Sequence, residues 1–479
     1  MRHNSHRSIL AAGFSLMLLA APFGALAQRA PKPGATRSAG VAVWVTTADK
    51  TVLFQPQAGR LTFGASTNAS PTIVIDEAKT YQTIDGFGYC LTGGSARLLH
   101  QMAPAGRARL LRELFGTEGR SIGVSYLRVS IGASDLDDRV FSYDDLPAGQ
   151  TDPTLARFSL APDQTHLLPV LKEILAINPN IKILGSPWSP PAWMKTNGES
   201  KGGSLKPEFY DAYARYFVKY IEAMQAAGVR IDAITVQNEP LHPGNNPSLL
   251  MPAEQQAAFI GQSLGPAFRQ AKLDTKIICY DHNADKPEYP LTVLNDATAA
   301  PYVDGSAFHL YAGPIEALGR VHDAHPEKNV YFTEQWVGSK STFAENLRWH
   351  LETLIIGGTR NWARTVLEWN LAADPQQNPH TPGGCTECLG AITLAGNAVT
   401  RNEAYYIIAH ASKFVRPGSV RVATNLPANL PNVAFRTPAG QKVLLVLNTS
   451  PSPMQFTIGY QGKTVATALA SNSAGTYVW

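Results

Sequence analysis

The chain has 479 residues and a formal net charge of +4 at pH 7; 44% of its residues are hydrophobic and 16% are charged. This length and composition exclude a small single domain and fit one large barrel with an accessory domain. A net charge so close to zero excludes long-range attraction to nucleic acid or anionic lipid, so neither is an expected partner.

A secretory signal peptide is predicted for residues 1–27. Two arginines precede an apolar stretch, Ile9–Ala21, and the small-residue site Ala25-Leu26-Ala27 follows it, which is the order typical of signal peptides. The alternative, a membrane anchor, is disfavoured because the stretch is shorter than the about 20 residues that span a bilayer. We therefore expect cleavage before Gln28, a secreted or periplasmic protein and no stable membrane insertion.

Both ends of the remaining chain have the pattern of β-structure. Residues 28–40 are rich in Pro, Gly and Ala and are interpreted as a leader, whereas residues 41–75 and 419–479 contain short β-type runs separated by turn residues. The N-terminal segment has too few strands to be stable alone. We predict that residues 28–77, after the leader, and residues 413–479 contribute strands to one β-sandwich.

Between residues 78 and 412, short apolar strands alternate with helical patterns. Eight strands are expected, at Thr83–Gly88, Tyr126–Ile131, Ile181–Ser186, Ala233–Asn238, Lys276–Tyr280, Gly305–Leu310, Asn329–Glu334 and Thr365–Asn370. This alternation predicts the α/β class and a (β/α)8 TIM barrel as the catalytic domain. The alternative is an open doubly wound sheet, but no G-x-G-x-x-G follows the first strand to support its dinucleotide-binding version.

The ends of six predicted strands carry the polar and aromatic residues expected of an active site, which lies at the C-terminal ends of barrel strands. These residues are Arg128 and Asp135, Trp188, Asn238 and Glu239, His309 and Tyr311, Glu334, and Glu368-Trp369-Asn370. Tryptophan faces cover the apolar C–H faces of a sugar, while Asn and Asp bind its hydroxyl groups. The set therefore favours a carbohydrate substrate.

Two of these residues fit the chemistry of glycoside hydrolysis. Hydrolysis with retention needs two carboxyl groups about 5–5.5 Å apart, one protonated and one ionised. Glu239 and Glu334 end the fourth and seventh strands, which face each other across a barrel mouth. We expect Arg128 beside Glu334, where its charge would hold the pKa of that carboxyl low. Carboxylates and water complete the reaction, so neither a metal nor an organic cofactor is implied.

Each residue taken alone has an ordinary explanation. Asn-Glu-Pro is also a common helix start, Trp188 fits a core, Arg128 a structural ion pair and His309 a hydrogen-bonded structural histidine. The convergence of six strand ends on one rim is what favours a site. The remaining acids near the second strand, Asp137, Asp138, Asp144 and Asp145, are interpreted as solvated loop residues.

The chain has four cysteines. Cys385 and Cys388 form a C-x-x-C that lacks the second pair or the histidines of a zinc site. In an exported protein a local disulfide between them is favoured. Cys90 and Cys279 are interpreted as buried free thiols.

Taken together, these motifs resemble glycoside hydrolase family 30, which contains glucosylceramidases and β-1,6-glucanases. The matching segments are Tyr81–Gly88, Tyr126–Gly132, Gly185–Lys195, Gln237–Pro240, Phe332–Glu334 and Glu368–Ala372. The resemblance implies that Glu239 is the acid/base, Glu334 the nucleophile and Arg128 a neighbour of the nucleophile. The residues that it places around the terminal sugar are Asp135, Trp188, Asn238, Tyr311 and Trp369.

The expected function is that of a secreted retaining β-glycoside hydrolase. Its substrate would be a β-D-glucoside, either a glucosylceramide-like glycoside or β-1,6-glucan, cleaved by double displacement. Alternatives are another β-glycosidase specificity (xylosidase, fucosidase or xylanase) or a catalytically inactive carbohydrate-binding barrel. The presence of both Glu239 and Glu334 argues against the inactive barrel. Departures from the glucosylceramidase pattern at Glu368, Leu310 and the loop 383–388 bear on specificity rather than on chemistry.

Overall fold

The computed structural model of the chain describes residues 40–65 and 71–479. The predicted signal peptide and residues 28–39 of the predicted leader lie outside the described residues. None of the helices in the described part has the length and apolar character needed to cross a lipid bilayer.

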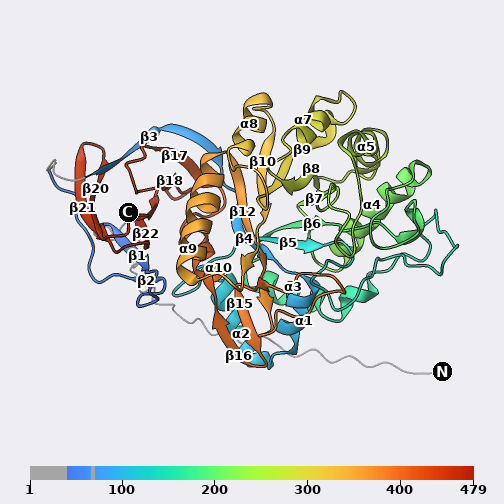
Figure 1. Cartoon of the computed structure of the whole chain (residues 1–479), viewed down its shortest axis with the longest axis horizontal. Helices are drawn as coiled ribbons and strands as arrows, with labels where there is room; N and C mark the ends of the chain where they lie inside the picture. The colour runs from blue at the N-terminus through green and yellow to red at the C-terminus, as the bar shows by residue number, and fades with distance from the viewer. Residues whose placement is uncertain (1–39, 66–70) are drawn as a thin grey trace, which may run out of the picture. The chain divides into compact units, whose positions relative to one another are not determined.

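Eight parallel strands close into a barrel, which confirms the predicted fold (Figure 1). In order round the barrel they are β4 (Gly86–Cys90), β5 (Tyr126–Ser130), β6 (Lys182–Ser186), β7 (Ala233–Thr235), β8 (Lys276–Asn283), β9 (Val303–His309), β10 (Asn329–Glu334) and β12 (Ala363–Asn370). Apolar and tyrosine side chains from seven of them, among them Leu184, Ile278 and Leu367, fill the interior. The barrel is therefore a packed core, and polar groups collect at its ends.

The first barrel strand is displaced from its predicted position. Thr83, predicted as its first residue, instead ends β3 (Thr72–Thr83), a strand of the other sheet, and β4 begins at Gly86. Gly86 has a φ of 151°, and a Cβ atom there would lie 2.6 Å from Ser125 Oγ. Glycine thus permits the bend between the two sheets at a point where the chain is closely packed.

Helices surround the barrel, and most of them bury one apolar face, whereas every residue of α10 is buried. In α3 the buried residues Leu167, Leu171 and Ile174 recur at helical spacing. The α-helices are α1 (Gly93–Gln101), α2 (Pro104–Phe115), α3 (Leu167–Ile177), α4 (Tyr210–Ala226), α5 (Ala253–Phe259), α6 (Gly265–Gln270), α7 (Glu288–Asn295), α8 (Ala317–Ala324), α9 (Phe343–Trp349) and α10 (Glu403–Ser412). Shorter or wider turns form η1 (Ala161–Gln164), η2 (Ala192–Met194), η3 (Pro207–Phe209), η4 (Ile260–Leu264), η5 (Ala300–Tyr302) and η6 (His350–Gly358).

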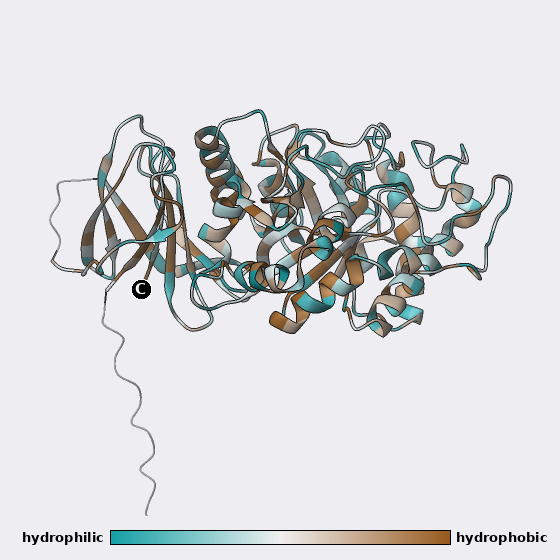
Figure 2. Ribbon diagram, turned by 90° about the horizontal axis from the view of Figure 1, so that it is seen from below, coloured by the Kyte–Doolittle hydropathy of each residue, from teal (hydrophilic) through white to brown (hydrophobic). Residues whose placement is uncertain are grey.

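Strands from both ends of the chain form one nine-stranded sheet, as predicted. Its order is β2 (Gln55–Pro56), β1 (Ala42–Thr46), β22 (Ala474–Val478), β19 (Lys442–Leu447), β18 (Asn432–Arg436), β17 (Val420–Thr424), β3, β20 (Met454–Tyr460) and β21 (Lys463–Leu469). Phe456 on β20 and Tyr477 on β22 contact each other, with ring centroids 5.9 Å apart, although four strands separate them in this order. The sheet therefore folds over itself into a sandwich, whose strands carry much of the apolar colour in that part of Figure 2.

The barrel and the sandwich share hydrogen bonds through α10. The ring nitrogens of His410 lie 2.8 Å from Thr46 Oγ1 and 2.8 Å from Thr476 Oγ1, so one side chain joins the barrel to both ends of the chain. The segments after β10 and β12 contain short strands that were not predicted: β11 (Val337–Gly338), β13 (Ala372–Ala373), β14 (Cys388–Leu389), β15 (Ile392–Ala395) and β16 (Ala398–Arg401). The pair β11–β14 borders the site described next.

Candidate active site

A cavity of about 380 Å³ opens at the C-terminal ends of the barrel strands. Six of the eight predicted site residues line it: Asp135, Trp188, Glu239, Tyr311, Glu334 and Trp369. The other two, Arg128 and Asn238, lie directly behind it, because Arg128 donates hydrogen bonds to both Glu334 and Asn238. The structure therefore brings together all eight residues.

Glu239 and Glu334 face each other across a histidine. Glu334 is the last residue of β10, Glu239 follows β7, and both side chains are at least nine-tenths buried. His309 Nδ1 lies 3.1 Å from Glu239 Oε1 and 3.8 Å from Glu334 Oε1. Two carboxyl groups are thus held beside one imidazole nitrogen at the barrel mouth.

The backbone is strained where these residues are held. Glu239, Tyr280 and Asp281 have φ values of 45°, 71° and 72°, which cost a non-glycine residue of order 1–3 kcal/mol. The Glu239 N–H donates to the Asp281 carbonyl oxygen at 2.9 Å, so the ends of β7 and β8 hold each other in place. Strain of this kind is concentrated at functional sites.

Arg128 organises the polar floor of the cavity. It is fully buried and donates to Glu334 Oε2 (2.5 Å), Asn238 Oδ1 (2.7 Å) and Asp281 Oδ2 (2.8 Å). Burial alone would lower the pKa of Arg128, but the carboxylates of Asp281 and Glu334 raise it above its ordinary value. The Tyr311 hydroxyl donates to the other oxygen of Glu334, Oε1, at 2.9 Å. Glu334 therefore receives one fixed donor on each oxygen.

The expected low pKa of Glu334 is wrong. Burial raises the pKa of Glu334, and the nearby charges of His309 and Arg128 offset this rise only in part. Burial also raises the pKa of Glu239, but the imidazoles of His282 and His309 beside its carboxyl group outweigh this effect and lower that pKa below its usual range. The order of the two pKa values is thus the reverse of the order that a Glu239 acid and a Glu334 nucleophile require.

His309 carries positive charge in this arrangement. Burial would lower the pKa of His309, but Glu334, Asp281 and Glu239 together raise it to about 9. Its Nε2 lies 3.1 Å from Asp281 Oδ1, and its Nδ1 faces Glu239. A proton is therefore held on the imidazole next to the Glu239 carboxylate.

Stacked indole rings form one wall of the cavity. The Trp188 and Trp369 ring centroids are 5.4 Å apart with an interplanar angle of 28°, and the Arg128 guanidinium lies 4.8 Å from the centre of the Trp188 ring. The buried Trp188 Nε1 has no acceptor among residues 40–65 and 71–479. Because buried donors are nearly always paired, this N–H is available to a ligand hydroxyl.

A loop closed by the predicted disulfide holds Asp135. The Cys385–Cys388 bond is confirmed, and Cys90 and Cys279 are buried free thiols, as expected. The Cys385 N–H donates to Asp135 Oδ2 at 3.3 Å, and the Thr381 N–H donates to the Asp135 carbonyl oxygen at 2.8 Å. Both cysteines also line the cavity. The loop thus fixes a carboxylate that faces the ligand space.

Removing this disulfide with Cys385→Ser/Cys388→Ser is expected to lower kcat/KM by about 10- to 100-fold, because small misplacements of a substrate-binding group are costly. The measurement is steady-state kinetics on a glucoside. In an Asp135→Asn background the same double substitution should cause little further loss, since the loop acts through that carboxylate. Losses that simply multiply would contradict this coupling.

Asp135 also predicts a pH-dependent contribution to stability. Burial, assisted by the charge of Glu334, raises the pKa of Asp135 from 3.8 to about 7. The folded protein therefore binds this proton more tightly than the unfolded chain, so the contribution of Asp135 to stability falls as pH rises from about 4 to about 7 and then stays constant. Relative to wild type, Asp135→Asn should be more stable at about pH 8 than at about pH 5.

Urea unfolding at both pH values measures this difference. As a control, Asp274→Asn replaces a carboxylate that is 89% exposed, and it should change the free energy of unfolding by the same small amount at both pH values. An Asp135→Asn effect that is independent of pH would show that the carboxyl group does not titrate in this window.

Sequence reasoning missed Asp281 and did not consider His282. The predicted fifth strand ended at Tyr280, whereas β8 continues to Asn283, and Asp281 contacts both Arg128 and His309. The available signal was the polar run Asp281-His282-Asn283 directly after an apolar strand. It marks a strand end in the same way as the other site residues.

Three acids are placed differently from the sequence interpretation. Asp137 and Asp144 are 4% and 1% exposed rather than solvated, and Asp137 accepts hydrogen bonds from Ser134 N and Oγ. Asp138 and Asp145 are exposed, as expected. Glu368, counted with the rim, lies with its Oε1 2.8 Å from His350 Nδ1 and does not line the cavity.

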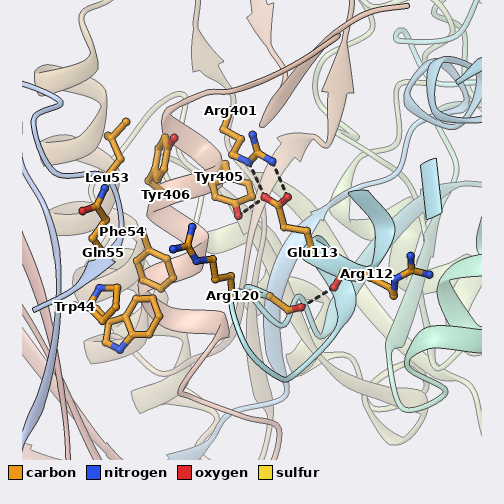
Figure 3. A pocket seen from close by; sticks show the side chains of 12 residues that line it. Trp44, Leu53, Phe54, Gln55, Arg112, Glu113, Arg120, Arg401, Tyr405 and Tyr406 are labelled. Atoms are coloured by element: carbon orange, nitrogen blue, oxygen red, sulfur yellow. Dashed lines mark hydrogen bonds and ion pairs between the residues drawn. The ribbon is translucent and has the colours of Figure 1, made fainter. Parts of the chain in front are cut away.

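A second, larger hollow of about 770 Å³ lies beside β1, α2 and α10 (Figure 3). Among the described residues that line it there is one carboxylate, Glu113, which is ion-paired with Arg401 and accepts a hydrogen bond from the Tyr405 hydroxyl at 2.7 Å. A hollow with one engaged carboxylate does not supply the pair that glycoside hydrolysis needs. The strand-end cavity is the candidate active site.

Two facing carboxyl groups beside stacked tryptophans at the mouth of a (β/α)8 barrel define a site for hydrolysis of glycosides. Models of known families agree with this class. The "Glycosyl hydrolase family 30 TIM-barrel domain" matches residues 84–415, and the "Glycosyl hydrolase family 30 beta sandwich domain" matches residues 418–477. The chain belongs to glycosyl hydrolase family 30.

Two named activities occur among the relatives that match most of the chain. An endo-1,6-beta-D-glucanase of Neurospora crassa is 38% identical over 377 residues, which are 76% of this chain and 77% of the relative. The lysosomal acid glucosylceramidase of Mus musculus is 31% identical over 85% of this chain and 83% of the relative. Among solved structures, the endo-beta1,6-glucanase BT3312 superposes with a TM-score of 0.86 at 35% identity, covering 92% of this chain and 99% of that one. The chain is therefore a glycoside hydrolase that acts on glycans.

Proposed function

We propose that this enzyme cleaves β-1,6-linked glucan with retention of anomeric configuration, as a secreted or periplasmic protein. The observation that carries the proposal is the pair Glu239 and Glu334, held beside one His309 nitrogen at the barrel mouth. Similarity to endo-1,6-beta-glucanases, at 38% and 35% identity, exceeds that to the mouse glucosylceramidase at 31%.

The exposed apolar residues near the cavity bear on the choice between a polymer and a lipid glycoside. In the described part of the chain the exposed large hydrophobic side chains are Val74, Tyr81, Leu250, Tyr311, Trp349 and Leu426. Of these, Tyr311 alone lines the cavity. Tyr311 also borders a neighbouring hollow of about 800 Å³, which Trp349 and Leu426 line as well. The two hydrocarbon chains of a ceramide would need such an apolar surface beside the sugar site, so the proposed glucan specificity rests on the sequence identities given above.

In the proposed mechanism, Glu334 attacks the anomeric carbon, and the bond to the leaving oxygen breaks as Glu239 protonates that oxygen. Glu239 then removes a proton from water, and the resulting hydroxide displaces Glu334 from the covalent intermediate. Arg128 and Tyr311 stabilise the Glu334 carboxylate each time it leaves. Asp135, Trp188, Asn238 and Trp369 hold the terminal sugar.

The proton for the first step is supplied through His309. Its Nδ1 is 3.1 Å from Glu239 Oε1, so the proton moves one hydrogen-bond length to Glu239, which passes it to the leaving oxygen. This path accounts for an acid whose pKa is lowered by its histidine neighbours. In the second step Glu239 takes a proton from the attacking water and returns it to His309, which restores the starting state.

Export is proposed from the N-terminal sequence. Residues 1–27 have the basic, apolar and small-residue order of a signal peptide. The Cys385–Cys388 disulfide supports the proposal, since such bonds persist in oxidising compartments. Immunodetection of the mature chain in periplasmic and culture fractions tests it, and retention of the uncleaved chain in the cytosol would contradict it.

A comparison of substrates tests the specificity. The purified enzyme is incubated with linear β-1,6-glucan, with glucosylceramide in detergent micelles and with β-1,4-xylan, and the products are separated by size. We expect soluble gluco-oligosaccharides from β-1,6-glucan and much slower release from the other two. A higher kcat/KM on glucosylceramide would replace the proposed substrate with the second group of relatives, and one on xylan would contradict both.

A further inference from the structure

Three potential metal ligands converge on the rim of the cavity. Glu239 Oε1 lies 3.1 Å from His309 Nδ1 and 3.8 Å from His282 Nδ1, and all three atoms lie within 4.8 Å of one another. In a tetrahedral zinc site with bonds of about 2.0–2.1 Å, neighbouring ligand atoms are about 3.4 Å apart. Small rotations of the three side chains would therefore bring these atoms to the spacing that one ion requires.

Two further observations favour a ligand here over a simple hydrogen-bond network. His282 is 7% exposed, and its Nδ1 has no hydrogen-bond partner in residues 40–65 and 71–479 although it points toward Glu239. His309 has a carboxylate, Asp281, on its other nitrogen at 3.1 Å, and Asp281 is itself fixed by the Thr333 hydroxyl at 2.6 Å. A carboxylate behind a histidine is the usual outer shell of a zinc site.

We propose that Glu239, His282 and His309 form a binding site for Zn²⁺ and that an ion bound there inhibits hydrolysis. Two imidazoles and one carboxylate oxygen suit borderline-soft ions, whereas Mg²⁺ and Ca²⁺ require more oxygen ligands. Glu239 and His282 line the cavity, so the fourth coordination position faces the substrate space. The ion would occupy the Glu239 oxygen that must otherwise take and release a proton.

Binding is tested without substrate. Isothermal titration calorimetry of the mature protein, freed of metal with EDTA and dialysed, is carried out with zinc chloride. One ion per chain is expected. His282→Asn should weaken binding by more than about 100-fold, since loss of an outer partner alone costs 10- to 100-fold. His242→Asn, which replaces an exposed histidine of the same cavity, should leave the affinity unchanged.

Glu239→Gln provides a second variant, because it removes the anionic ligand at nearly constant shape, and circular dichroism checks the fold of each variant. Absence of binding, or stoichiometric binding that both variants retain, would overturn the proposed site. The inhibitory role rests on the proposed function and is tested separately: Zn²⁺ should inhibit glucoside hydrolysis and EDTA should reverse it, while Mg²⁺ should have no effect. Full activity with Zn²⁺ bound at the site would overturn the inhibitory role. If the enzyme does not cleave β-1,6-glucan, the proposed function fails, but the calorimetric titration still tests the zinc site.

Discussion

Glu334→Ala is expected to lose activity on every β-glucoside, by roughly 10⁴-fold or more, because no other group can form the covalent intermediate. Glu239→Ala should differ in kind. Its first step should stay fast for dinitrophenyl glucosides, whose leaving group needs no proton, while its second step becomes slow. Steady-state and burst kinetics on dinitrophenyl and alkyl glucosides measure the difference. As a control, Glu387→Gln changes a partly exposed carboxylate of the disulfide loop, paired with Lys340, and should keep near wild-type activity.

Azide separates the two roles by stereochemistry. In Glu239→Ala, azide replaces the water activated by the missing base and should give the β-glucosyl azide. In Glu334→Ala, azide enters from the side of the missing nucleophile and should give the α-azide. This test is needed because the protein environment lowers the pKa of Glu239 and raises that of Glu334, which taken alone would make Glu334 the acid. The opposite pair of azide products would reverse our assignment.

Arg128→Met is expected to lower the free energy of unfolding by about 3–5 kcal/mol, the cost of breaking a buried ion pair from one side. Arg128 is fully buried and contacts Glu334 and Asp281, so its loss leaves these two buried carboxylates with the His309 imidazolium as their remaining cationic neighbour. Chemical denaturation measures the loss. Adding Asp281→Asn should recover part of it, since one uncompensated charge disappears.

Arg97→Met is the matched control, because the Arg97–Asp138 pair is solvent-exposed, with side chains 39% and 47% accessible. Exposed pairs contribute about 0–1 kcal/mol. If Arg128→Met costs no more than this control, Arg128 does not hold the floor of the site together through its charge.

The parts of the fold that were predicted correctly are those with regular apolar patterns. All eight barrel strands were recognised because each is a short apolar run between helical patterns, and the site residues because they follow such runs. Two predicted strand boundaries were wrong: Thr83 belongs to β3 rather than to the first barrel strand, and β8 continues past Tyr280. Because the fifth barrel strand was predicted to end at Tyr280, Asp281 and His282 were not recognised as site residues.

What could not be predicted depends on contacts between distant segments. The family resemblance predicts Arg128 near Glu334, but the sequence does not predict that His282 and His309, from β8 and β9, would shift the pKa of Glu239. Likewise, Asp137 and Asp144 are in a loop without periodic pattern, and their burial depends on how the loop folds against its neighbours: the Asp144 carbonyl accepts a hydrogen bond from Trp193 Nε1. Loop burial of this kind has no local sequence signal.

The anomeric configuration of the first product tests the account most directly. Proton NMR is used to follow the wild-type enzyme on an aryl β-glucoside and on a β-1,6-linked gluco-oligosaccharide from the first turnovers, before mutarotation mixes the anomers. Double displacement by Glu239 and Glu334 predicts that the β-anomer forms first and the α-anomer appears only later. Initial formation of the α-anomer would contradict the retaining mechanism and the roles proposed for the two carboxyl groups.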